Sequence, residues 1–187
     1  MSEAHRKKKQ PEQVRRTLLE CTAKIAAEVG VARVTIEAVA KAAGITKGGL
    51  LHHFPSKQAL INAMVADMLE QVDKELDDCM AKDSIAKGRF TRAYVAMSLN
   101  DDNFNPLDPW SFISVSLISG KSSVDQFFNW FNNRIEMHKD TDSDPLLELI
   151  RFAADGAWLH LAAMMNEDSA KKATTIRNKL ISITLSI

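Results

Sequence analysis

Apolar residues recur at intervals of three and four positions along most of the 187-residue chain, the spacing that gathers them on one face of an α-helix. No stretch has the alternating pattern of a β-strand, so the sequence predicts an all-α protein. Gly30 ends the first periodic stretch, and residues 140–144 are expected to form an acidic loop. The expected helices, about nine in number, begin near Pro11, Thr35, Lys47, Ser56, Ser84, Trp110, Ser122, Pro145 and Ser169.

Two short helical stretches on either side of Gly44 have the features of a helix-turn-helix. Gly44 can adopt the positive φ with which helices commonly end, and the small Ala40 allows the second helix to cross close by. Leu50 can be buried beneath that crossing, and the hydroxyls of Thr35 and Thr46 can cap the two helices. Such a unit places its second helix in the major groove of DNA. A plain helical hairpin within an α-bundle fits the same positions.

The run from Gly44 to Lys57 reads Gly-Ile-Thr-Lys-Gly-Gly-Leu-Leu-His-His-Phe-Pro-Ser-Lys. It resembles the signature of the TetR family of bacterial transcriptional regulators, and the resemblance covers about the first third of the chain. It implies a three-helix DNA-binding head, joined by a fourth helix to a helical body that binds a ligand and dimerises. We therefore expect a disordered basic tail at residues 1–10, a helix-turn-helix domain at 11–55, and a ligand-binding and dimerisation domain at 56–187.

The resemblance also implies which residues contact DNA, namely Thr35, Thr46, Lys47, Gly48, Gly49, Leu51, His52 and Lys57. Hydroxyl and ammonium groups suit phosphate contacts, and the glycines let the helix backbone approach a phosphate closely. The chain departs from the family at Leu51 and His52, where aromatic residues, often tyrosine, are usual. Because Leu51 cannot donate a hydrogen bond and Gly49 has no side chain, more of the affinity is expected to rest on Thr35, the two lysines and the basic tail.

Charge is unevenly distributed, although the net charge of the chain is zero. Residues 1–60 contain eleven Lys and Arg but five Asp and Glu, a net charge of +6, and the remainder carries −6. A basic head on an acidic body fits double-stranded DNA as a partner at one end. The run Arg6-Lys7-Lys8-Lys9 can add contacts to phosphates or to the minor groove.

The sequence gives little support for metal binding, disulfide formation, secretion, membrane insertion or catalysis. His52 and His53 are adjacent, so on a helix they do not share a face for metal binding. Cys21 and Cys79 lie far apart and outside any CxxC motif, as reduced thiols of a cytoplasmic protein do. The polar start is not a secretory signal, and no apolar run approaches the roughly 20 residues needed to span a membrane. We expect no metal, no cofactor and no enzyme, because no nucleophile–base pair or paired acids are apparent.

Aromatic residues other than Phe54 concentrate in the second part of the chain. Together with methionines, such side chains line apolar ligand cavities, but each of them can equally fill the hydrophobic core. The candidate ligand-binding residues are Phe90, Tyr94, Met97, Trp110, Phe127, Phe128, Phe131 and Trp158.

The last two expected helices carry small residues that let another helix approach closely, among them Ala153, Ala154, Gly156 and Ala157. The resemblance implies that this helix pair forms a four-helix interface in a homodimer. A two-fold dimer also suits paired half-sites in DNA. Packing within a single chain would account for the same residues.

Together these features predict a cytoplasmic, dimeric DNA-binding regulator. The favoured form is a repressor that is released from a palindromic operator when a small hydrophobic or amphipathic ligand tilts the fourth helix. The alternative is a DNA-binding protein of the same fold that has no small-molecule effector and is controlled by a protein partner.

Overall fold

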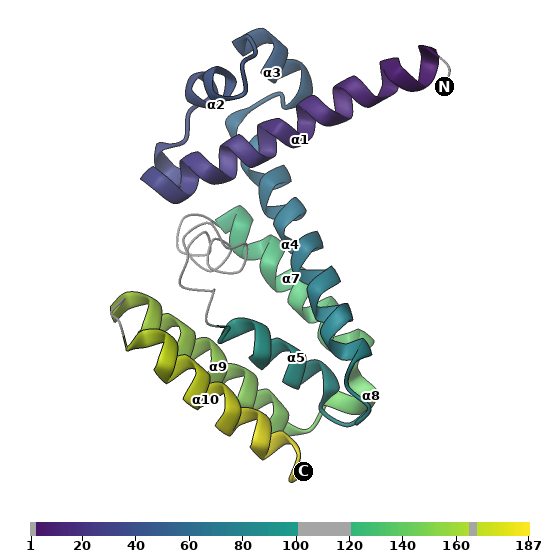
Figure 1. Cartoon of the computed structure of the whole chain (residues 1–187), viewed down its shortest axis with the longest axis vertical. Coiled ribbons are helices and arrows are strands. Elements are labelled where there is room, and N and C mark those ends of the chain that lie inside the picture. The colour runs from purple at the N-terminus through teal and green to yellow at the C-terminus, as the bar shows by residue number, and fades with distance from the viewer. Residues whose placement is uncertain (1–2, 101–120, 165–167) are drawn as a thin grey trace. The chain divides into compact units, whose positions relative to one another are not determined.

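The computed structural model describes residues 3–100, 121–164 and 168–187, and the regular structure in these ranges is entirely helical (Figure 1). The predicted all-α class is thus confirmed. The helix expected at 110–119 lies outside the described residues. The described ranges hold nine α-helices and one 3-10 helix: α1 (Glu3–Val29), η1 (Val31–Arg33), α2 (Ile36–Ala42), α3 (Lys47–His53), α4 (Lys57–Ala81), α5 (Arg89–Ser98), α7 (Lys121–Met137), α8 (Lys139–Asp142), α9 (Pro145–Met164) and α10 (Ser169–Thr184).

The first helix is longer than the sequence pattern indicates. Disorder at residues 1–10 and a helix start at Pro11 were expected, but α1 begins at Glu3 and Pro11 lies inside it. The residues before Pro11 include Glu, Ala, Lys, Arg and Gln, which are good helix formers. Pro11 itself removes one backbone hydrogen bond, to the carbonyl of Lys7, and the helix continues on both sides.

Two helices differ from the prediction: one begins later than expected, and one forms where a loop was expected. α5 begins at Arg89 instead of near Ser84, because Gly88 takes a φ of 73° that a helix does not allow. A Cβ at Gly88 would also lie 3.1 Å from a methyl group of Leu147. The expected loop at 140–144 contains α8, which is held in place by bonds from Asp142 to α5.

The last helix is capped differently from the prediction. Ser169 was expected to be the N-cap, but it is the first helical residue and is buried, while Asp168 occupies the N-cap position without a side-chain capping bond. The N-caps expected at Thr35, Thr46 and Ser56 are confirmed, because each hydroxyl accepts the N–H three residues further along.

The chain forms two compact units. The first comprises Met1–Met68 and Phe112–Gln126, and the second comprises Leu69–Ser111 and Phe127–Ile187. Helices α4 and α7 contribute residues to both units. The domain boundary expected after residue 55 stays a prediction.

Each unit has its own apolar core. In the second unit α5, α9 and α10 pack against one another. Complete burial of a leucine-sized side chain contributes about 1.5–3 kcal/mol. The first unit buries Leu18, Val34, Val39, Leu50 and Leu60, and the second buries Phe90, Val95, Leu99, Leu147, Ala154 and Ala173.

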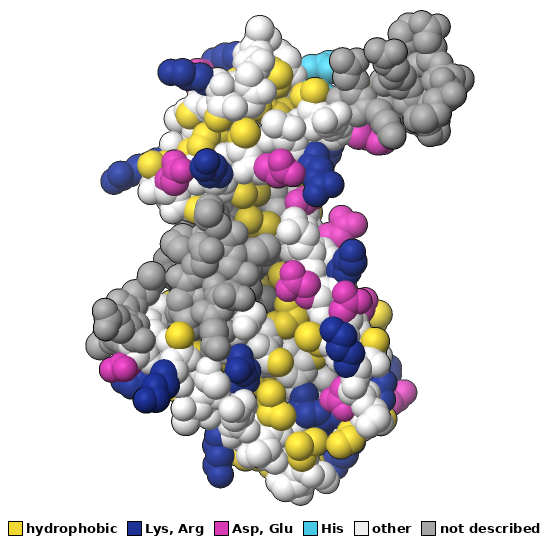
Figure 2. Space-filling view, viewed as in Figure 1, with side chains coloured by type: hydrophobic (Ala, Val, Ile, Leu, Met, Phe, Trp, Pro, Cys, Tyr) yellow, Lys and Arg dark blue, Asp and Glu magenta, His cyan; other side chains and the backbone are white. Residues whose placement is uncertain are grey.

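Charges of both signs share the described surface. Over the face shown in Figure 2, Lys and Arg side chains are interspersed with Asp and Glu side chains. One example is the exposed pair Arg16–Glu20 on α1, with 3.0 Å between Nε and Oε1.

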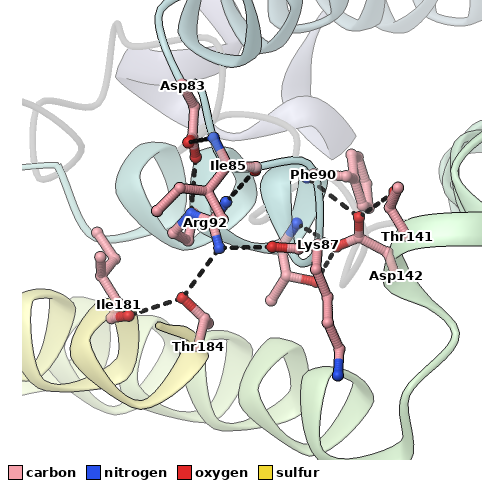
Figure 3. A network of polar contacts seen from close by, with 10 residues as sticks. Asp83, Ile85, Lys87, Phe90, Arg92, Thr141, Asp142, Ile181 and Thr184 are labelled. Carbon is pink, nitrogen blue, oxygen red and sulfur yellow. Dashed lines mark hydrogen bonds and ion pairs between the residues drawn. The ribbon is translucent and has the colours of Figure 1, made fainter. Parts of the chain in front are cut away.

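A buried carboxylate fixes the start of α5 (Figure 3). Asp142 is fully buried and accepts the backbone N–H groups of Phe90 (3.3 Å) and Thr91 (2.8 Å), and the hydroxyl of Thr91 (2.6 Å). Arg151 of α9 donates to the hydroxyl oxygen of Thr91 at 2.6 Å. An anion at a helix N-terminus is stabilised by the unpaired N–H groups and the helix dipole, so α5, α8 and α9 are joined at this point.

Arg92 fixes the connection between α4 and α5. Its Nε pairs with Asp83 at 2.6 Å, and its Nη atoms donate to the backbone carbonyls of Lys87 (2.8 Å) and Ile85 (2.5 Å). A longer contact of 3.5 Å reaches Thr184 of α10. One buried guanidinium thus joins the connection to both α5 and α10 (Figure 3).

Candidate nucleic-acid interface and ligand site

The first unit contains a complete helix-turn-helix made of α2 and α3. Gly44 in the turn has a φ of 69°, as predicted, and the N–H of Ile45 closes the turn on the carbonyl of Ala40 at 3.0 Å. Ala40 and Leu50, at 3% and 0% exposure, are buried where the two helices cross. Local residues determine the conformation of the turn, and packing in the core stabilises it.

Each capping threonine hydroxyl accepts one hydrogen bond and can still donate its own proton. Thr35 accepts the N–H of Ala38 at 3.1 Å, and Thr46 accepts that of Gly49 at 3.0 Å. Both threonines are exposed. Because a hydroxyl that accepts a bond can still donate its own proton, each remains able to donate to a phosphate oxygen at a helix N-terminus.

The other predicted contact residues lie on α3 and at the start of α4. Gly48 and His52 are exposed, while Gly49, Leu51 and Lys57 are half-buried. A side chain at Gly49 would meet the hydroxyl of Thr46 at 3.3 Å, so glycine keeps this cap open. No residue of this set is buried in the core, which leaves every one of them accessible to a partner.

Lys47 opens the recognition helix and is already paired with an acid. Its Nζ lies 2.6 Å from Oε1 of Glu37 on α2, and both side chains are mostly exposed. The hydrogen bond from Lys47 holds the pKa of Glu37 below its usual value. Exposed pairs of this kind are worth about 0–1 kcal/mol, so Lys47 can exchange Glu37 for another anion at little cost. The sequence pattern does not reveal this pair.

Lys57, predicted to bind phosphate, has a bond within the protein. Its Nζ donates to the backbone carbonyl of Ala32 in η1 at 2.8 Å. The ammonium group is therefore held at the start of α4, and it can also be approached from solvent because Lys57 is half-buried.

The two adjacent histidines lie at the end of α3 with ring centroids 5.9 Å apart. Among the described residues, no three His, Cys, Asp or Glu side chains are grouped so that they could hold a metal ion. The following Phe54 is buried under the guanidinium of Arg15, whose Cζ lies 4.5 Å from the ring centroid. In the described part of the chain, no helix is long and apolar enough to cross a membrane.

The predicted ligand-binding aromatics of the body come together between α5 and α7. Phe131 lies 5.3 Å from Tyr94, 6.4 Å from Phe90 and 6.0 Å from Phe127, measured between ring centroids. Phe128 also touches Phe127 but is 52% exposed. Met97 and Trp158 are buried, and Trp110 lies outside the described residues. The structure gathers most of the set, and its role in ligand binding stays a prediction.

A line of polar groups on α9 was not predicted. Arg151, Asp155 and Trp158 are spaced four and three residues apart, so they share one face of the helix. The phenol of Tyr94 donates to Asp155 at 2.6 Å, and burial, followed by the charge of Asp155, raises the pKa of Tyr94. Trp158 is 7% exposed, and its Nε1 is buried without a hydrogen-bond partner.

A second polar cluster joins α4 to α7, and we call Asp73, Asp77, Trp130 and Arg134 the α4–α7 latch. The indole of Trp130 donates to Asp73 at 2.7 Å, and Nη2 of Arg134 donates to Asp77 at 2.6 Å. Arg134 is buried, and its Cζ lies 5.9 Å from the ring centroid of Phe90. The latch therefore contacts the aromatic cluster.

The face of α9 opposite to its core residues is apolar and exposed. Leu149, Phe152 and Leu159 are 61%, 58% and 53% exposed. Gly156 lies on the same stripe, and a Cβ built there meets nothing within 4 Å. Natural monomers rarely expose a contiguous apolar stripe without a use for it.

Two family models match the chain, and together they cover most of it. Residues 18–64 match the model of bacterial regulatory proteins of the tetR family, and residues 88–185 match that of the tetracyclin repressor-like C-terminal domain. The first match contains the helix-turn-helix, and the second contains α5, α7, α8, α9 and α10 almost completely.

Curated relatives match about a third of the chain. The chain is 39% identical over 59 residues to the HTH-type transcriptional repressor KstR2 of Rhodococcus jostii (strain RHA1), covering 31% of this chain and 29% of that one. It is 36% identical over 61 residues to KstR2 of Mycolicibacterium smegmatis, covering 33% and 30%. The match thus spans less than a third of the length of these relatives.

Solved structures share the fold over nearly the whole chain. A TetR transcription regulator from Haloarcula marismortui superimposes with a TM-score of 0.71 at 15% identity, covering 90% of this chain and 96% of that one. The regulator FadR of Bacillus subtilis, solved with stearoyl-CoA, has a TM-score of 0.66 at 11% identity, covering 89% and 97%.

Proposed function

The chain belongs to the TetR family of bacterial regulatory proteins, a family of transcriptional regulators with a helix-turn-helix. On this premise we propose that it is a dimeric repressor that leaves a palindromic operator when it binds a small hydrophobic or amphipathic ligand. The observation that carries the proposal is the capped and glycine-turned helix-turn-helix, with its candidate contact residues exposed or half-buried. The curated relatives that match part of the chain are named transcriptional repressors, which favours repression, and a DNA-binding role is consistent with a cytoplasmic protein.

In the proposed complex the start of α3 reads the major groove. Lys47 exchanges Glu37 for a phosphate or a guanine edge, and the hydroxyls of Thr35 and Thr46 donate to phosphates. The half-buried Leu51 can contact a thymine methyl group. Lys57 and His52 add backbone contacts, so phosphate binding supplies much of the affinity.

Dimerisation is supported by the exposed apolar stripe of α9. In a two-fold dimer the same patch of both subunits meets itself, and an apolar stripe around Gly156 suits a close helix crossing. A dimer also presents two heads to the two half-sites of a palindrome.

The route from ligand to DNA is the continuous helix α4, which contains residues of both units. The latch bonds Asp73 and Asp77 of α4 to α7, and Arg134 of the latch contacts Phe90 of the aromatic cluster. A ligand that displaces these rings would strain the latch and tilt α4. Because linkage is reciprocal, operator DNA would in turn weaken ligand binding.

The test is a titration of fluorescent DNA from the region upstream of the protein's own gene, followed by anisotropy at several salt concentrations. A specific complex that weakens steeply with salt is expected. Failure to form any complex stronger than that with scrambled DNA of equal length would overturn the proposal.

A protein partner in place of a small molecule is the second candidate. The close packing of Phe90, Tyr94, Phe127 and Phe131 on one another is what a filled core looks like, and it favours this alternative. A ligand screen by thermal shift separates the two, because a small-molecule effector raises the melting temperature by an amount that increases with its affinity and concentration.

A further inference from the structure

The indole N–H of Trp158 is a hydrogen-bond donor with nothing to bond. Trp158 is 93% buried, and its Nε1 is shielded from solvent and has no partner. Buried polar groups are almost always paired, because an unpaired donor has given up its bonds to water without replacement. A water molecule or a group from outside the chain can supply the missing acceptor.

The polar side chains near Trp158 on α9 already have hydrogen-bond partners within the protein. Asp155, three residues earlier on α9, accepts the phenol of Tyr94 at 2.6 Å. Arg151, a further turn away, donates to the hydroxyl of Thr91 at 2.6 Å and to the carbonyl of Asp142 at 3.3 Å. The cation on this face is therefore engaged within the protein, and the nearest charge to Trp158 along the helix is the carboxylate of Asp155.

Apolar surface adjoins this polar face. The ring of Tyr94 lies 5.3 Å from that of Phe131, which in turn stacks on Phe127. Tyr94 thus belongs both to the aromatic cluster and, through its hydroxyl, to the polar face of α9. Through this bond, the aromatic cluster is linked to the face of α9 that also carries Trp158.

We propose that the effector is an uncharged, largely apolar molecule whose carbonyl-type oxygen accepts the indole N–H of Trp158. The inference rests on the proposed effector-controlled function and specifies its ligand class. A ketone, ester or amide satisfies the orphan donor. A carboxylate would be repelled by the negative charge of Asp155, and Arg151 is already engaged within the protein. An amine would suit Asp155 but would leave the indole N–H unpaired.

Three probes with apolar chains of matched length test this class: 2-undecanone, decanoate and decylamine. Binding to the full chain is measured by calorimetry. We expect the ketone to bind about tenfold more tightly than decanoate, because it avoids the repulsion from Asp155. It should also bind more tightly than decylamine, which leaves the indole N–H unpaired.

Trp158→Phe removes the donor and keeps an aromatic ring. It should weaken ketone binding about five- to tenfold and leave the affinities for decanoate and decylamine unchanged. Because the smaller ring can disturb packing, an independent readout uses the wild-type protein. The chain has three tryptophans, and the indole ¹H–¹⁵N signal missing from the spectrum of the variant identifies Trp158. Ketone binding should move that signal downfield, as a new hydrogen bond requires, while the signal of Trp130, which already donates to Asp73, moves less.

The inference is overturned if the ketone does not bind, if it binds no better than the charged probes, or if the Trp158 signal stays in place on binding. Operator binding is followed in the same preparations. A protein that binds its operator and is released by a charged ligand, with Trp158 unaffected, keeps the proposed function and loses this inference. A protein that binds no operator DNA loses the proposed function whatever the probes do.

Discussion

Among single residues, His138 is the group whose protonation opposes folding. It is half-buried, its ring stacks on that of Phe90 with centroids 5.2 Å apart, and its Nε2 is buried with no hydrogen-bond partner. Burial and then the charge of Arg134 lower the pKa of His138, and the opposing attraction of Asp142 and Asp77 is smaller. The neutral imidazole is therefore the form that fits the folded state.

The direction of the pH effect follows from this lowered pKa. The unfolded chain binds the proton more readily, so the free energy of unfolding decreases as pH falls below about 6.5 and continues to decrease until the folded-state pKa is passed. We expect His138→Gln to reduce the pH dependence of stability between about pH 7 and pH 5, measured by urea denaturation. His52→Gln, on the exposed surface of α3, is the control. Equal pH profiles for the two variants would show that protonation of His138 is not linked to folding.

Local rules predict some functional residues and miss others. Thr35 and Thr46 could be predicted as caps because an N-cap depends only on the next three residues. The pairing of Lys47 with Glu37 depends on how α2 crosses α3. The unpaired N–H of Trp158 depends on everything packed around α9. Neither feature has a counterpart in the sequence pattern.

Between the elements α2 and α3, we expect the Lys47–Glu37 pair to set how readily the proposed recognition helix accepts a phosphate. Lys47→Ala should weaken operator binding and make the slope of log K against log salt shallower by about one unit, because one fewer counterion is released. Glu37→Gln should strengthen binding by about threefold, since it removes both a competitor for Lys47 and a repelling charge. Both are measured by anisotropy titration across salt concentrations.

Glu28→Gln on α1, an exposed acid in the same unit, controls for a general charge effect. If Glu28→Gln strengthens binding as much as Glu37→Gln does, the ion pair has no specific role. An unchanged salt slope in Lys47→Ala would mean that the head docks on DNA in another way.

The latch between α4 and α7 should transmit the effector signal. Arg134→Met keeps a flexible unbranched stem and removes the ion pairs with Asp77 and Asp73. We expect the variant to bind the operator without ligand but to need about tenfold more ligand for release, since the coupling free energies of allosteric proteins are typically 1–3 kcal/mol. Lys74→Met, on the exposed side of α4, should behave as wild type. Normal release from Arg134→Met would show that the signal takes another route.

Whole elements were predictable wherever one apolar stripe repeats over several turns, as it does in α4 and α9. The misplaced boundaries have tertiary causes. The connection before α5 ends at Gly88, whose positive φ is possible for glycine but could not be predicted from the sequence. Helix α8 forms where Asp142 accepts a hydrogen bond from the start of α5. The unexpected start of α1 at Glu3 has the opposite cause, because there helix propensity outweighs the single break at Pro11.

At the scale of the whole molecule, the proposed function requires a second copy of the chain. Phe152 lies on the exposed apolar stripe of α9, so Phe152→Glu should place a pair of like charges within the proposed dimer interface. We expect a monomer by analytical ultracentrifugation and a loss of about a hundredfold or more in operator affinity, because one head alone forfeits the effective concentration of the second. As a control, Asn132→Glu introduces the same charge at an exposed position of α7 and should leave the dimer intact. A dimeric Phe152→Glu would place the interface elsewhere.

The guanidinium of Arg92 has a consequence for proteolysis. Connections without regular structure are ordinarily where proteases cut, since the backbone there can extend into an active site. Between α4 and α5, however, the carbonyls of Ile85 and Lys87 are bonded to Arg92, and Asp83 is paired with it. The exposed basic residues Lys82 and Lys87 therefore lie on a backbone that cannot extend until α5 itself loosens. We therefore expect trypsin to cut this connection only when α5 unfolds locally.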